Sequence, residues 1–272
     1  MPLALPRSLC AAAFAVALAT TVAAGQTGKP DATPAPAKPA PAPDFVVPFK
    51  VGEVLTYDVT WSNVVTGGSA SLSIKERRAA GAGRTGYYIA AQADPRPLFE
   101  KLYPYRYKAD TLLDTKTLLP IQASTFSSER GRTRTKTTRF LPNGSTIDFQ
   151  VQTSTLVRDK RQVPPHPQDP LSLLYFLRSI PFKEGDNIRI PVTDGGSVFY
   201  VRVLFGSPSP IKTGAGTFSA WQVRITLTDE NGQAMGKKFT LWLSADRRRL
   251  PVRIDIGLPV GTFVVTLARV TP

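Results

Sequence analysis

The stretch VLTYDVTWS (residues 54–62) alternates apolar and polar side chains, with Leu55, Tyr57, Val59 and Trp61 on one side and polar residues on the other. A period of two is typical of an antiparallel strand that buries one of its faces. The same alternation returns along the chain, in the segments 70–74, 221–227, 239–243, 252–258 and 263–267. The chain is therefore expected to be built mainly from strands.

Turn-forming residues separate these segments. Asn143-Gly144 and Asn231-Gly232 suit tight hairpin turns, because both residue types tolerate positive φ. About a dozen strands joined by hairpins predict an all-β, mainly antiparallel fold. The expected form is a strongly curved sheet, a half-barrel or a sandwich, in which Trp61 and Trp221 are structural residues.

One segment, residues 169–180, departs from this pattern. Asp169 and Pro170 are typical of a helix N-cap and first turn, and Pro181 is a stop signal. The ten residues LSLLYFLRSI between them are apolar nearly all round, which indicates a short helix buried on both sides. Such a helix is expected either to plug the mouth of a curved sheet or to be simple core.

The first 48 residues indicate export. Residues 1–25 have the layout of a signal peptide, with Arg7 before an apolar run at 9–19 and small residues at 23–25. Residues 26–48 form a Pro/Ala-rich linker, and 49–272 are expected to form a single β-rich domain. Cleavage after Ala24 or Gly25 would remove Cys10, the only cysteine. The mature protein is then expected to be periplasmic, with neither disulfides nor a transmembrane span.

The net charge of +14 favours anionic partners. Nucleic acid is disfavoured, because an exported protein rarely meets it and no base-stacking motif accompanies the basic residues. An envelope lipid or glycolipid, or an envelope protein, remains as the expected partner.

Two groups of residues are candidate ligand contacts. Alternate positions of ERGRTRTKTTR place a basic ladder on one face of a strand, at Arg130, Arg132, Arg134 and Lys136. The alternative is that these charges only solvate the sheet and discourage edge pairing. Three tyrosines share a face of LYPYRYKAD, at Tyr103, Tyr105 and Tyr107, and they suit either a cavity wall or core packing.

No residue constellation indicates catalysis. His166 is the only histidine and, with no cysteine in the mature chain, cannot complete a typical zinc site. The acidic residues show no spacing that pairs two carboxylates, and most alternate onto the solvent side of strands; those considered are Glu53, Asp58, Asp94, Glu100 and Asp110. We therefore expect a protein that is not an enzyme and uses no cofactor or metal.

Four stretches together resemble a known family: VGEVLTYDVTW (51–61), DPLSLLYFLR (169–178), GTFSAWQV (216–223) and LWLSADRRRLPVRI (241–254). In this order and spacing they are similar to the bacterial "domain of unknown function 3108" family, over about residues 49–270. The resemblance implies an exported β-rich protein and supplies no activity or catalytic residues.

The expected function follows from compartment, charge and fold. A non-enzymatic envelope protein that binds an apolar or anionic amphiphile, such as a lipid, acyl chain or glycolipid, is favoured. The alternatives are an interaction module that docks on envelope proteins or peptidoglycan, and a cell-envelope hydrolase.

Overall fold

The computed structural model describes residues 43–61, 65–96, 105–129, 131–258 and 261–271. The expected signal peptide, most of the linker, Tyr103 and Arg130 lie outside the described residues. Residues 42–272 form one compact unit.

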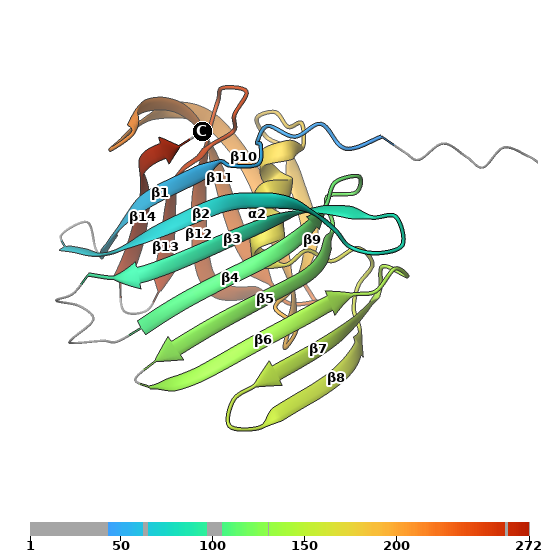
Figure 1. Cartoon of the computed structure of the whole chain (residues 1–272). Helices are drawn as coiled ribbons and strands as arrows, with labels where there is room; N and C mark the ends of the chain where they lie inside the picture. Colours follow the sequence, from blue (N-terminus) through green and yellow to red (C-terminus); the bar gives the residue numbers. More distant parts are fainter. Residues whose placement is uncertain (1–42, 62–64, 97–104, 130, 259–260, 272) are drawn as a thin grey trace, which may run out of the picture. The chain divides into compact units, whose positions relative to one another are not determined.

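The described residues of this unit form fourteen strands and one helix (Figure 1). Before the helix come β1 (Val54–Trp61), β2 (Val65–Ala79), β3 (Thr85–Pro95), β4 (Tyr105–Asp114), β5 (Pro120–Glu129), β6 (Arg132–Phe140), β7 (Thr146–Gln152) and β8 (Leu156–Gln162). The helix is α2 (Pro170–Ser179). After it come β9 (Asn187–Thr193), β10 (Val198–Thr213), β11 (Gly216–Thr228), β12 (Ala234–Ser244), β13 (Pro251–Leu258) and β14 (Gly261–Thr271).

All strands belong to one antiparallel sheet in the order β8-β7-β6-β5-β4-β3-β2-β1-β14-β13-β12-β11-β10-β9. The first and last strands pair in its middle, with Val59 opposite Val265. The edges are therefore β8 and β9, which follow each other in sequence with α2 between them. The all-β prediction is confirmed, and the form is an open curved sheet rather than a closed barrel.

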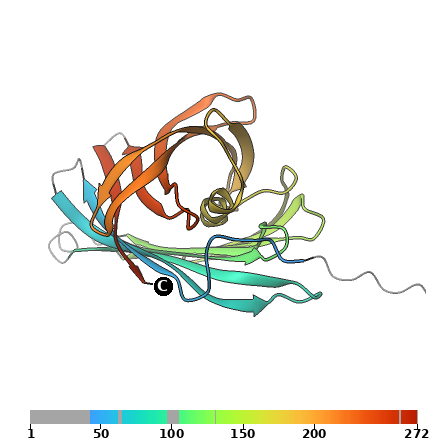
Figure 2. The same cartoon turned by 90° about the horizontal axis from the view of Figure 1, so that it is seen from above.

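The two halves of the sheet curve differently. Strands β1–β8 form a broad, gently twisted layer, and β9–β14 curl into a nearly complete turn above it (Figure 2). The helix α2 lies between the halves, at the opening of the curl (Figures 1 and 2).

The helix packs one side against each half. Leu173 and Leu177 join the core of the curled half, with residues of β9–β12. Leu171 and Tyr175 join the core of the broad half, with residues of β2–β4. The helix is apolar nearly all round because each of its two sides packs against an apolar core.

The start of α2 is fixed by its cap. Asp169 Oδ1 accepts hydrogen bonds from the backbone N–H groups of Leu171 and Ser172, and the Ser172 Oγ accepts from the Asp169 N–H. Thr111 on β4 donates to the other oxygen of Asp169 at 2.8 Å. The predicted N-cap is confirmed, and it also ties the helix to the broad half of the sheet.

The segment before β1 is already part of the domain. The Phe45 N–H donates to the Thr115 carbonyl at 2.6 Å, and Asp44 pairs with Arg77. Phe49 is buried edge-on against Tyr87 and Tyr175. Asp44 and Phe45, which belong to the expected linker at residues 26–48, are thus bonded to the folded unit.

The two tryptophans differ in their surroundings. Trp221 is half-buried and packs edge-on against Phe182, with ring centroids 5.6 Å apart. Trp61 ends β1 and is 43% exposed, although Leu55 and Tyr57 on the same strand are buried. The register with β2 shifts after Val59, where β2 carries one extra residue, Gly67, before the last pairs that include Trp61.

Candidate ligand-binding site

A cavity of about 600 Å³, here called the trough, lies between the broad half of the sheet, the start of α2 and β13. Side chains of β3–β6 line one wall, with Tyr107 and Ala109 among them. Pro170 and Leu171 of the helix and Ile254 and Ile256 of β13 line the other. Its volume lies within the range of about 300–1,000 Å³ usual for small-molecule sites.

Two cations from β6 line the trough. Arg134 and Lys136 are two positions apart and so share one face of the strand. The Lys136 Nζ donates to Asp194 Oδ2 at 2.5 Å, whereas Arg134 has no carboxylate partner among the described residues. Burial alone would raise the pKa of Asp194, but the hydrogen bond from Lys136 holds it below its ordinary value. Positive charge therefore borders the trough.

The turn between β9 and β10 carries Asp194 and is fixed in place. Gly195 has a φ of 83°, and a Cβ there would lie 2.2 Å from the Phe149 ring. Arg161 on β8 donates to the Gly196 carbonyl at 2.7 Å. Side-chain contacts thus join the β9–β10 turn to β6, β7 and β8, although β8 and β9 do not pair as strands.

A second cavity of about 280 Å³, here called the groove, lies on the other side of α2 against the curled half. Every residue that lines it is apolar, and those lining it are Pro170, Leu173, Leu174, Leu177, Val192, Phe199, Val201, Ile225, Leu227, Phe239, Leu241 and Ile254. Pro170 and Ile254 line both cavities. The groove and the trough are therefore neighbours.

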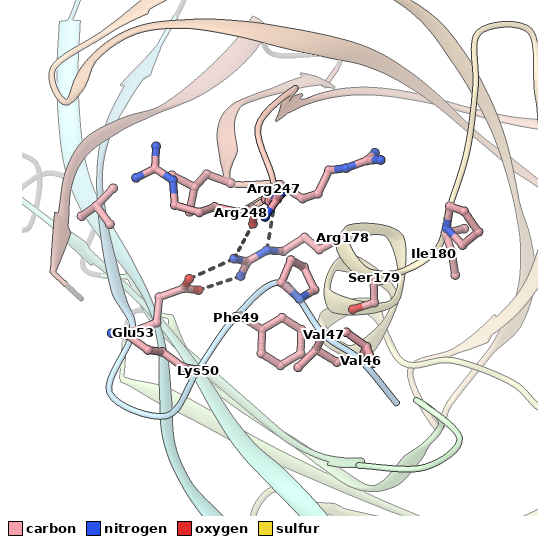
Figure 3. A pocket seen from close by; sticks show the side chains of 15 residues that line it. Val46, Val47, Phe49, Lys50, Glu53, Arg178, Ser179, Ile180, Arg247 and Arg248 are labelled. Carbon is pink, nitrogen blue, oxygen red and sulfur yellow. Dashed lines mark hydrogen bonds and ion pairs between the residues drawn. The ribbon is translucent and has the colours of Figure 1, made fainter. Parts of the chain in front are cut away.

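A third pocket of about 930 Å³, here called the end pocket, lies at the C-terminal end of α2 (Figure 3). In its wall Arg178 forms a bidentate ion pair with Glu53, at 2.7 and 3.0 Å. Its Nε and Nη2 also donate to the carbonyls of Arg249 and Arg248, in the turn between β12 and β13. Burial alone would lower the pKa of Arg178, but the bonds to Glu53 raise it above its ordinary value.

The predicted contact residues are distributed as follows. Arg134, Lys136 and Tyr107 line the trough, and Arg132 is exposed at the start of β6. Tyr105 begins β4, but the contacts of its side chain lie outside what the structure describes. The structure thus brings part of the ladder and one tyrosine to the same cavity.

Sequence reasoning missed the pairing of Glu53 with Arg178. Glu53 was one of five carboxylates most of which were expected on the solvent side, and it is buried. Glu53 precedes β1, and its position is set by the helix partner Arg178 and not by strand alternation. A signal existed: Arg178 is the only charge in an otherwise apolar helix, and a buried charge requires a partner.

Nowhere among the described residues do three His, Cys, Asp or Glu side chains lie close enough together to hold a metal ion. None of the helical residues described there forms a stretch long and apolar enough to cross a bilayer.

Three solved structures are similar to this chain over most of its length. The first, a β-barrel-like protein of the domain of unknown function DUF1849 from Brucella abortus, has 12% identity and a TM-score of 0.47, over 81% of this chain and 97% of its own. A candidate exported protein with a YmcC-like fold from Bacteroides fragilis has 12% identity and a TM-score of 0.36, over 84% of this chain and 100% of its own. A candidate lipoprotein from Parabacteroides distasonis has 11% identity and a TM-score of 0.35, over 84% of this chain and 100% of its own.

None of the curated proteins matches the chain. The model of the family described as "Protein of unknown function (DUF3108)" matches residues 56–268, which is most of the chain and all strands except part of β1 and β14. The chain therefore belongs to the DUF3108 family.

Proposed function

We propose that this protein is a carrier or sensor of anionic amphiphiles in the cell envelope, with the trough and the groove as its binding site. One observation supports this most directly: a cavity with cations on its wall adjoins an apolar groove beside the same helix. An acidic head group bound at Arg134 and Lys136 would leave its apolar chain next to the groove. Export of the chain is part of the proposal and rests on its first 25 residues.

The groove supplies the energy of binding in this proposal. Ile225, Leu227 and Phe239 are only half-buried although they lie inside the curled half of the sheet. Covering apolar surface contributes roughly 25 cal/mol per Å². An acyl chain there would cover surface that the protein's own side chains leave open.

The cations supply the selectivity. Hydrogen bonds from an arginine or lysine to a carboxylate or phosphate are about twice as strong as those between neutral groups. Arg134 has no carboxylate partner among the described residues, so its charge is available to a ligand. An uncharged amphiphile would gain only the binding energy of its apolar contacts in the groove.

Fluorescence titration tests the proposal with two probes of similar size. One is 1-anilinonaphthalene-8-sulfonate, which is anionic, and the other is N-phenyl-1-naphthylamine, which is uncharged. The purified protein should bind both, and the anionic probe more tightly. Ile225→Trp fills the groove and should weaken both at least tenfold, whereas Val157→Trp, on the exposed strand β8, should change neither.

Arg134→Gln should weaken only the anionic probe, and Arg158→Gln on β8 is its matched control. If Ile225→Trp binds both probes as the wild type does, the groove is not the site. Native mass spectrometry of delipidated protein, re-exposed to fatty acids and phospholipids, then identifies the natural class of ligand. A protein that retains none of them under gentle conditions contradicts the proposal.

A further inference from the structure

The end pocket is strongly basic. Five cationic residues line it, Lys50, Arg178, Arg247, Arg248 and Arg249, against the single carboxylate of Glu53. Figure 3 shows Arg247 and Arg248 on one side of the pocket and Lys50 and Val46 on the other. Neither the trough nor the groove includes any of these residues.

Not all of these charges are available. Arg178 is held by Glu53, and Arg248 forms an ion pair with Asp246. Lys50 and Arg247 are exposed, and neither has a carboxylate partner among the described residues. Two cations at opposite sides of the pocket are thus directed to solvent.

Apolar side chains are exposed beside these cations. Val46 lines the pocket and is 89% exposed, the highest value among the large apolar residues described. Its neighbour Phe45 and Val51, next to Lys50, are also exposed. All three of these exposed apolar residues thus lie within one short segment, residues 45–51, at one end of the domain.

The segment that presents them is firmly held. The Phe45 N–H is bonded to Thr115, and Phe49 is packed between Tyr87 and Tyr175. The Gly52 N–H donates to the carbonyl of Ile74 at 2.8 Å. Val46 and Lys50 are therefore displayed at fixed positions, so that binding costs little ordering of the backbone.

We propose that this end of the molecule docks on the surface of an anionic phospholipid bilayer. Val46 and Val51 enter the interface between head groups and acyl chains, and Lys50 and Arg247 lie against lipid phosphates. Exposed apolar side chains flanked by lysine and arginine are the usual composition of surfaces that lie on membranes. The proposal is separate from the interior amphiphile and holds even where that site is empty.

Charge complementarity favours a bilayer over a free anion or an acidic protein. The cations stand on opposite sides of an open pocket and not around one point. This arrangement suits the many phosphates of a bilayer surface better than it suits a single soluble anion. Each lysine or arginine near an anionic membrane contributes roughly a fivefold gain in binding. The apolar residues beside them have no role in binding a soluble anion.

Vesicle co-sedimentation tests this docking. The protein should bind vesicles of phosphatidylglycerol and phosphatidylethanolamine more than vesicles of phosphatidylcholine, and 0.5 M NaCl should reduce binding. Lys50→Gln with Arg247→Gln should weaken partitioning about 25-fold, at fivefold for each charge. Arg158→Gln with Lys160→Gln on β8 removes the same charge elsewhere and should weaken it less than twofold.

The apolar contribution has its own pair of variants. Val46→Ser should weaken binding severalfold, whereas Val157→Ser on β8 should not. All six substituted sites are exposed, so the fold should persist, which circular dichroism checks. Equal losses in both double variants, or equal binding to both kinds of vesicle, would overturn the proposal, and the probe titrations of the trough are unaffected by either result.

Discussion

Arg178 and Glu53, 125 residues apart in sequence, form a buried bidentate ion pair. The Arg178 side chain has no exposed surface and that of Glu53 has 9%. The guanidinium also bonds to the carbonyls of Arg248 and Arg249 and lies over the rings of Phe49 and Tyr175. Three of the four stretches that carry the family resemblance thus meet at one side chain: the segment before β1, the helix, and the turn between β12 and β13.

Removing the negative partner should be costly. Glu53→Gln leaves the Arg178 charge buried with no counter-ion, and breaking such a pair costs about 3–5 kcal/mol. Urea denaturation should show this loss in the free energy of unfolding. Glu76→Gln is the matched control, since Glu76 pairs with Arg78 at the surface, where ion pairs contribute about 0–1 kcal/mol. Similar losses in the two variants would mean that the buried pair stabilises no more than a surface one.

The cap residue Asp169 should make stability depend on pH. Burial raises the pKa of its carboxyl, so the folded state holds that proton more tightly than the unfolded chain does. This contribution favours folding at low pH and is lost as pH rises through the raised pKa. Asp169→Asn imitates the neutral form and keeps the cap, so its stability relative to the wild type should increase from pH 4 to pH 7.

Denaturation at several pH values measures this difference directly. Asp159→Asn serves as the contrasting control, because the hydrogen bond from Arg161 lowers the pKa of Asp159 and its contribution should have the opposite sign. A difference between Asp169→Asn and wild type that does not change with pH would contradict the expectation.

Asp194 should weaken the binding of anions in the trough, because it occupies Lys136. Asp194→Asn keeps the Oδ1 acceptor used by the Gly196 and Ser197 N–H groups and removes the charge that holds Lys136. The anionic probe should then bind about fivefold more tightly, as expected for about 1 kcal/mol of freed attraction. Binding of the uncharged probe should stay the same, and a gain for both probes would point instead to a change in cavity shape.

Export should be visible in the mass of the mature protein. Expressed in a Gram-negative host, the chain should appear in the periplasmic fraction beginning at Gly25 or Gln26. Val16→Arg interrupts the apolar run at 9–19 and should leave the chain uncleaved in the cell. Intact-mass measurement of both fractions distinguishes the two products, and an uncleaved wild-type chain would refute the expected signal peptide.

The sequence by itself determined the local structure. Alternation at Leu55 and Tyr57 predicted a strand with a buried face, and Asp169-Pro170 predicted the start of the helix, because strand periodicity and capping depend only on neighbouring residues. The family, too, was identifiable from four short stretches. None of this required knowledge of which strands pair.

The tertiary structure alone decided how these elements combine. That β1 pairs with β14, and that β8 and β9 become edges with α2 between them, follows from contacts among residues far apart in the chain. The same contacts place Arg134 and Lys136 beside a cavity, and they turn Glu53 inward to Arg178. A charge pattern gives the direction of a side chain from its strand, but what that side chain faces depends on how the rest of the sheet curves around it.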